Sequence, residues 1–99
     1  MSSFRLSLEA ARDITEIFDY IAQDSEKAAE RVRVGLLEAM RDLARMPGMG
    51  HRREDLTSRA VLFWPMGAYQ VIYKPGTQPL QIVAVLHGKR NIRPILRER

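Results

Sequence analysis

The chain has 99 residues, of which 45% are apolar, and it contains no cysteine. A chain of this length predicts one domain, residues 1–99, that buries only roughly 60–68% of its unfolded surface. The composition excludes a disulfide framework and a thiolate metal site. No apolar run approaches the roughly 20 residues of a transmembrane helix. The first residues also lack the apolar core of a signal peptide, so we expect a soluble, cytoplasmic protein without a membrane partner.

Positive charge is concentrated in the second half of the chain. Residues 1–50 carry 7 basic and 9 acidic side chains, whereas residues 51–99 carry 9 basic and 3 acidic ones. Such an excess indicates an anionic partner, either nucleic acid or an acidic protein. The alternative interpretation is a solvated surface that keeps the protein soluble.

The first half of the chain has the pattern of a short strand and two helices. Residues 4–8 alternate between apolar and polar, which is typical of a half-buried strand. Helical spacing follows from Ala10, after an N-cap at Ser7, and the polar face is expected to carry Arg12, Asp13, Glu16 and Asp19. A second helix starts at Ser25 and ends at Pro47. The short break between the two helices predicts an antiparallel helical hairpin.

The second half has the pattern of three strands. They are expected at residues 60–64, 68–74 and 80–86, with turns at 65–67 and 75–79. Phe63 and Trp64 are expected on opposite faces of the first of these strands. Strict alternation in the last strand predicts one common face for Leu80, Ile82, Ala84 and Leu86, and the other for Gln81, Val83, Val85 and His87.

The order of these elements predicts an α+β fold. A helical hairpin is expected to pack on one face of a mainly antiparallel sheet of three or four strands. Residues 48–60 are expected to form a loop, and residues 91–97 a short C-terminal helix or tail with Pro94 in its first turn. The other face of the sheet is expected to be concave, partly exposed and lined by the C-terminal basic group.

The element order resembles that of the RelE/ParE superfamily of small bacterial toxins. The residues that carry the resemblance are Tyr69-Gln70-Val71-Ile72-Tyr73 in the middle strand and Val85-Leu86-His87-Gly88-Lys89-Arg90 after the last. Three further segments resemble the ParE branch in particular, namely Ser7 to Ile14, Asp19 to Ala22, and Pro47 to Gly50. The resemblance covers nearly the whole chain and implies the toxin of a type II toxin–antitoxin system.

The RelE branch cleaves mRNA on the ribosome without a metal. This chemistry needs a base, an acid and cations that stabilise the charge on phosphorus. The resemblance places the middle-strand arginine of RelE at Gln70 and its terminal tyrosine near Ile95 or Leu96, and none of these can replace the missing groups. The alternative hypothesis is therefore an mRNA endonuclease with only three catalytic residues: His87, Lys89 and Arg90.

The ParE branch binds DNA gyrase and blocks it. The resemblance therefore favours a gyrase inhibitor that acts by binding, with no catalytic residue, cofactor or metal. The two histidines, His51 and His87, are too far apart in sequence to indicate a metal site. The expected target-binding residues, which would contact gyrase, gyrase-bound DNA or rRNA, are His87, Lys89, Arg90, Arg93 and Arg97. A third hypothesis is a degenerate toxin that retains only antitoxin binding.

Toxins of both branches are neutralised by a cognate antitoxin. The resemblance implies a ParD-like, DNA-binding dimer whose C-terminal tail wraps the toxin in a hetero-oligomer. Such a tail buries apolar side chains along the hairpin and the sheet edge. The expected antitoxin-binding residues are Ile17, Phe18, Ile21, Leu36, Met40 and Trp64.

Overall fold

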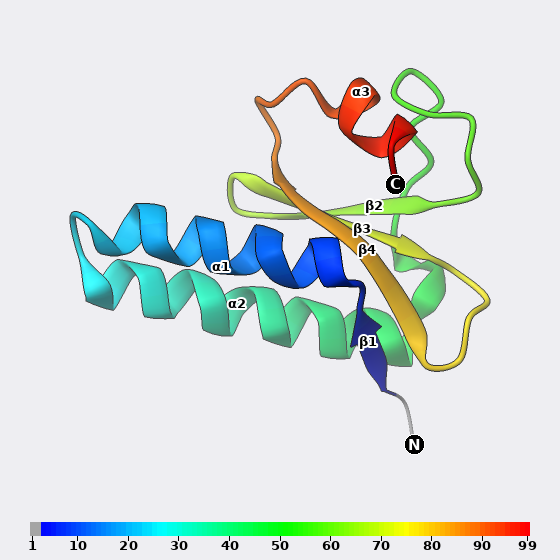
Figure 1. The fold of residues 1–99 in the computed structure, drawn as a ribbon. Helices are drawn as coiled ribbons and strands as arrows, with labels where there is room; N and C mark the ends of the chain where they lie inside the picture. The colour runs from blue at the N-terminus through cyan, green and yellow to red at the C-terminus, as the bar shows by residue number, and fades with distance from the viewer. Residues whose placement is uncertain (1–2) are drawn as a thin grey trace.

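The computed structural model describes residues 3–99. They form a four-stranded sheet with helices packed against it (Figure 1). The strands lie in the order β1-β4-β3-β2, with β1 parallel to β4 and the other neighbours antiparallel. The predicted α+β fold is confirmed. The elements in chain order are β1 (Phe4–Leu6), α1 (Leu8–Ala22), α2 (Glu26–Arg45), the 3-10 turn η1 (Pro47–Met49), β2 (Leu62–Met66), β3 (Tyr69–Lys74), β4 (Leu80–His87) and α3 (Ile92–Arg97).

Helices α1 and α2 pack side by side on one face of the sheet and extend beyond it (Figure 1). Both begin where the sequence predicts, because the Ser7 and Ser25 hydroxyl oxygens accept the backbone N–H groups of the third residue after each cap, at 3.0 and 3.1 Å. Helix α2 ends at Arg45, before Pro47. No described helix is long and apolar enough to span a membrane.

The apolar stripe of α2 faces the sheet and not the solvent. Leu36 is 1% exposed and Met40 is fully buried, and both belong to the core that includes Val71 and Tyr73. Neither side chain can contact a partner while the domain is folded. Leu36 and Met40 are therefore removed from the expected antitoxin-binding residues, since helical spacing identifies an apolar face but not what covers it.

The hairpin between β2 and β3 is tighter than predicted. Pro65 was expected in the turn, but it lies within β2 opposite Gln70, and the turn consists of Gly67 and Ala68. A proline is tolerated there because β2 is an edge strand of the sheet. Gly67 has a φ of 59°, a conformation that other residues adopt at a cost.

Strand β4 changes its buried face at a β-bulge. The pairing of β3 with β4 shifts by one residue around Val83. Before the bulge Ile82 packs under the helices, whereas after it Ala84 packs on the opposite side of the sheet. The bulge also turns Val85 toward the helices. The prediction of one continuous face was therefore wrong, since the face is shared by only part of the set Leu80, Ile82, Ala84 and Leu86.

The second face of the sheet carries its own core and is less open than expected. Helix α3 and Val61 cover it, together with half-buried Leu56. Phe63 lies in this core and Trp64 packs on the helix side, so the prediction of opposite faces is confirmed. Because α3 lies over the sheet, the apolar residues of the C-terminal segment are structural. The buried members of this core are Val61, Phe63, Ile72, Ala84, Leu86, Ile92 and Leu96.

Tyr73 connects the segment after α2 to the sheet. Its side chain is fully buried, and its hydroxyl donates to the Pro47 carbonyl at 2.7 Å and accepts the Gly50 N–H at 2.9 Å. Burial raises the pKa of Tyr73 above its usual value because it penalises the phenolate, and the hydrogen bond from Gly50 opposes this rise only in part. The hydroxyl therefore stays protonated and holds the start of the long loop against β3.

Candidate functional site

A hollow of about 510 Å³ opens between α1 and the adjacent ends of β3 and β4. We call it the α1–β4 hollow. It brings together His87 and Arg90, expected to bind the target, and Ile17, expected to bind the antitoxin. Its lining residues are Asp13, Glu16, Ile17, Tyr20, Tyr69, Val85, Leu86, His87 and Arg90.

The His87 ring is fixed by two contacts at the rim of this hollow. Its Nδ1 accepts the backbone N–H of Lys89 at 3.0 Å, and the ring packs edge-on against Tyr69 with centroids 5.4 Å apart. An Nδ1 that accepts a hydrogen bond carries no proton, so in the neutral ring Nε2 carries it. Neither nitrogen then offers a free lone pair to a substrate hydroxyl, as a general base must.

Asp13 lines the α1–β4 hollow and is a buried position that the sequence did not reveal. It was expected on the polar face of α1, but it is only 5% exposed. Its carboxylate accepts the Val85 N–H at 3.0 Å and two N–H groups of Arg99 at 2.5 and 2.8 Å. The hydrogen bond to Asp13 is the main cause of the raised pKa of Arg99, with Glu9 and Glu16 adding attraction. The available signal was its position three residues after Ala10, on the buried side of the helix.

Asp13 and Ser7 together complete the edge of β4 where β1 has ended. The last pair between β1 and β4 is Leu6 with Ile82, so the strand beyond it has no partner on that side. There the Ser7 hydroxyl donates to the Val83 carbonyl at 3.3 Å, and Asp13 accepts the next N–H of that edge. Helix α1 thus satisfies backbone groups that a longer strand would have paired.

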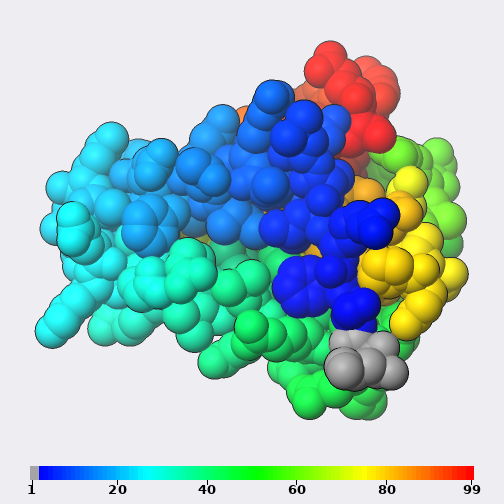
Figure 2. Space-filling model, turned by 60° about the horizontal axis from the view of Figure 1, so that its bottom comes forward, coloured from blue at the N-terminus to red at the C-terminus, as the bar shows by residue number. Residues whose placement is uncertain are grey.

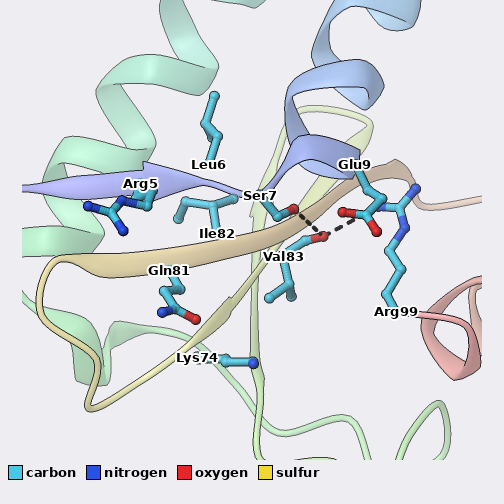
Figure 3. A pocket seen from close by; sticks show the side chains of 9 residues that line it. All are labelled: Arg5, Leu6, Ser7, Glu9, Lys74, Gln81, Ile82, Val83 and Arg99. Carbon is cyan, nitrogen blue, oxygen red and sulfur yellow. Dashed lines mark hydrogen bonds between the residues drawn. The ribbon is translucent and has the colours of Figure 1, made fainter.

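A second hollow of about 280 Å³ lies at this edge, between β1, β4 and Arg99 (Figure 3). Arg5 and Lys74 each pair in register with Gln81, so the three lie side by side across the sheet. Arg99 also donates to the Val83 carbonyl, at 3.4 Å (Figure 3). Because Arg99 is already paired with Asp13, this hollow offers a ligand only two further cations, and none of the expected site residues lies in it.

Arg93 and Arg97 do not lie with the other expected target-binding residues but line a third hollow, of about 410 Å³. We call it the arginine hollow. It lies between α3 and the loop before β2, and Arg59 joins it from that loop. The five expected residues therefore do not form one surface: His87 and Arg90 line the α1–β4 hollow, and Lys89 is exposed on the turn after β4.

The remaining antitoxin-binding residues lie on two sides of α1 and on β2. Ile17, Phe18 and Ile21 are half-buried. Phe18 lines a shallow groove shared with α2, whereas Ile17 lines the α1–β4 hollow. Figure 2 shows the two helices side by side at the surface of the molecule. Tyr20 beside Ile17 is 74% exposed and was not predicted.

The two histidines belong to different surroundings. His51 pairs through its backbone with Phe63, and its ring stacks on half-buried Trp64 at a centroid distance of 6.2 Å. The exposed His51 ring therefore shields part of Trp64, an expected antitoxin-binding residue. Within residues 3–99, no three histidine or acidic side chains converge as metal ligands would.

A family model described as "ParE toxin of type II toxin-antitoxin system, parDE" matches residues 4–92. The chain belongs to the ParE toxin family. The sequence resemblance to the RelE/ParE superfamily is thereby confirmed. No curated protein matches the chain significantly in sequence.

Two solved structures share the fold of this ParE family member. The first is the chromosomal ParDE TA system from P. aeruginosa, with a TM-score of 0.71 and 18% identity, covering 88% of this chain and 96% of that one. The second is the toxin–antitoxin complex RelBE2 from Mycobacterium tuberculosis, with a TM-score of 0.57 and 22% identity, covering 87% and 96%. At these identities the likeness concerns the fold.

Proposed function

We propose that this ParE-family toxin inhibits DNA gyrase by binding to it, and that it has no catalytic residue. The observation that carries the proposal is the hydrogen bond of Lys89 N–H to His87 Nδ1, because it occupies the lone pair that a nuclease base would need. The family match to ParE supports the same choice.

Ile95 and Leu96, near which the resemblance places the terminal tyrosine of RelE, are used for packing. Leu96 is 2% exposed in the core under α3, and Ile95 packs against it. An aromatic acid–base group at either position would have to leave that core. Both positions therefore favour a binding protein over a nuclease.

The expected target and antitoxin surfaces meet in the α1–β4 hollow, and this suggests how neutralisation works. Ile17 and Tyr20 form one side of the hollow, and His87 and Arg90 form another. An antitoxin tail with apolar side chains would bury Ile17 and Tyr20 and would cover His87 and Arg90 at the same time. We therefore propose that a cognate antitoxin neutralises the toxin by masking this hollow.

The purified toxin is expected to inhibit DNA supercoiling by gyrase and to leave translation in a cell-free extract unaffected. His87→Ala should retain most of this inhibition, because loss of one contact at a binding surface is a modest change, typically below about tenfold. The measurements are DNA supercoiling by gyrase and amino-acid incorporation in the extract, each titrated with the unmodified toxin and with His87→Ala.

Two outcomes would contradict the gyrase proposal. One is that the toxin promptly stops amino-acid incorporation in the extract and the mRNA is cleaved. The other is a loss of roughly 100-fold or more on replacing His87 in a cleavage assay, which is the effect expected of a general base.

A cognate antitoxin at 100 times its dissociation constant is expected to stabilise the toxin by about 2.7 kcal/mol. For a domain of this size the melting temperature should rise by roughly 10–20 °C. Tyr20→Asp should reduce this rise, because it removes a 74% exposed aromatic side chain from the rim of the hollow and puts a charge in its place. Val34→Asp, at a 39% exposed apolar position of α2 that does not line this hollow, serves as the control, and equal behaviour of both variants would exclude the hollow as the antitoxin site.

A further inference from the structure

The arginine hollow concentrates positive charge in a way that fold stability does not require. Arg93 and Arg97 are four residues apart on α3, a helix of only six residues, and both are exposed. Like charges at this spacing destabilise a helix by a few tenths of a kcal/mol. Arg59 adds a third cation from the loop, held in place by its hydrogen bond to the Leu96 carbonyl at 2.9 Å.

Glu54, which lines the arginine hollow, and its neighbour Asp55 both have other arginines as partners. Glu54 lies 3.8 Å from Arg52, and Asp55 forms a 2.8 Å pair with Arg53. The pKa of Asp55 is lowered mainly by the hydrogen bond from Arg53, and the charge of Arg93 contributes as well. Within residues 3–99, no ion pair involves a cation of this hollow.

Hydroxyl groups complement the guanidinium groups in the same hollow. Thr57 and Ser58 line it, and the Thr57 oxygen accepts the Arg59 N–H at 3.1 Å, so its hydrogen remains free to donate. Phosphate oxygens are commonly bound by arginine guanidinium groups, which can donate two parallel hydrogen bonds, and by hydroxyl donors. Arg93 and Arg97 lie about 6 Å apart along the helix axis, and a DNA strand presents a phosphate about every 3.4 Å of its axis, so the two can engage more than one phosphate.

We propose that the arginine hollow binds the phosphate backbone of duplex DNA. The choice of DNA rests on the proposed function, because gyrase holds a DNA duplex and a toxin bound to gyrase lies near it. The toxin would then contact protein through the α1–β4 hollow and DNA through the arginine hollow. The expected target-binding arginines are divided in the same way, with Arg90 at the first hollow and Arg93 and Arg97 at the second.

The test uses the purified full chain, a fluorescent 20-base-pair duplex and anisotropy titrations between 50 and 200 mM salt. The logarithm of the binding constant should fall with the logarithm of salt concentration with a slope of about −2 to −3, as expected for two to three phosphates. Arg93→Ala/Arg97→Ala should reduce the size of this slope by about 2 and weaken binding at least about tenfold at 50 mM salt.

The matched control is Arg31→Ala/Arg41→Ala, which removes the same charge from exposed positions of α2. Its slope should equal that of the unmodified toxin, and circular dichroism should show both variants folded. Equal losses in the two variants, or no duplex binding at 50 mM salt, would overturn the proposal. Tighter binding of single-stranded RNA or of poly-glutamate than of the duplex would overturn it too. Because the assay contains no gyrase, its failure is distinguishable from failure of the gyrase proposal.

Discussion

Replacing Asp13 by alanine is expected to lower the free energy of unfolding by about 3 kcal/mol, because it removes one partner of a buried ion pair. The Arg99 guanidinium, with 17% of its side chain exposed, would lose its anion, and the Val85 N–H would lose its acceptor. For a domain of this length the melting temperature should fall by roughly 10–20 °C. Urea denaturation followed by circular dichroism measures the loss.

Further variants separate the two roles of the Asp13 carboxylate. Asp13→Asn keeps an acceptor for the Val85 N–H but removes the charge, so its loss should be intermediate. Combining Asp13→Ala with Arg99→Ala should cost at least about 1 kcal/mol less than the sum of the single losses, because the residues are in direct contact. Additive losses would mean that the pair contributes nothing to stability.

An exposed ion pair provides the control for this experiment. Asp42 and Arg45 lie one turn apart on α2, with side chains 51% and 67% exposed. Asp42→Ala should change stability by less than about 1 kcal/mol, since exposed pairs are screened by water and salt. A loss as large as that of Asp13→Ala would show that burial of the Asp13 pair is not the cause.

Replacing Gly50 by alanine is expected to cost about 2–3 kcal/mol by overpacking. The added Cβ would lie 2.5 Å from the Tyr73 hydroxyl oxygen and 3.0 Å from the Leu62 Cβ. The backbone at Gly50 has a φ of −71°, which alanine adopts freely, so the cost is steric alone. Tyr73 cannot move aside, because it is buried and its hydroxyl is held by two hydrogen bonds.

Gly48→Ala is the matched control, since no atom lies within 4 Å of its added Cβ. We expect its stability to change by less than about 0.5 kcal/mol. Tyr73→Phe removes the nearest obstacle, so it should recover part of the loss when combined with Gly50→Ala. By itself Tyr73→Phe should cost about 1–3 kcal/mol, because the Gly50 N–H and the Pro47 carbonyl lose their partner. Equal losses from the two glycine variants would exclude the steric explanation.

The helices were predictable because their signals are local. The two serine caps and Pro47 act on backbone groups within a few residues, and the observed helices begin and end beside them. The strands were predictable in number and order, but not at every boundary. Pro65 was placed in a turn because its occurrence in a strand depends on β2 being an edge, and the position of a strand in the sheet is not encoded locally.

The candidate site was predictable only in part. His87, Arg90 and Ile17 were expected in binding sites and line one hollow, whereas the sequence did not indicate that Asp13 and Tyr20 line it as well. Asp13 was missed because its partners, Val85 and Arg99, lie 72 and 86 positions further along the chain. Its position three residues after Ala10 is a local signal for the buried side of α1, but the groups that it pairs with are not local.

The sequence by itself determined the order of elements, the α+β fold, the membership of the toxin superfamily and the basic character of the second half. Superfamily membership follows from the resemblance of short motifs, and the other three properties follow from capping, periodicity and composition, each of which acts over short stretches of chain. The tertiary structure decided that β4 bulges at Val83, that α2 buries Leu36 and Met40, and that the expected target-binding arginines divide between two hollows. The physical reason is that register, burial and charge clustering depend on contacts between residues distant in sequence, which only the packed chain brings together.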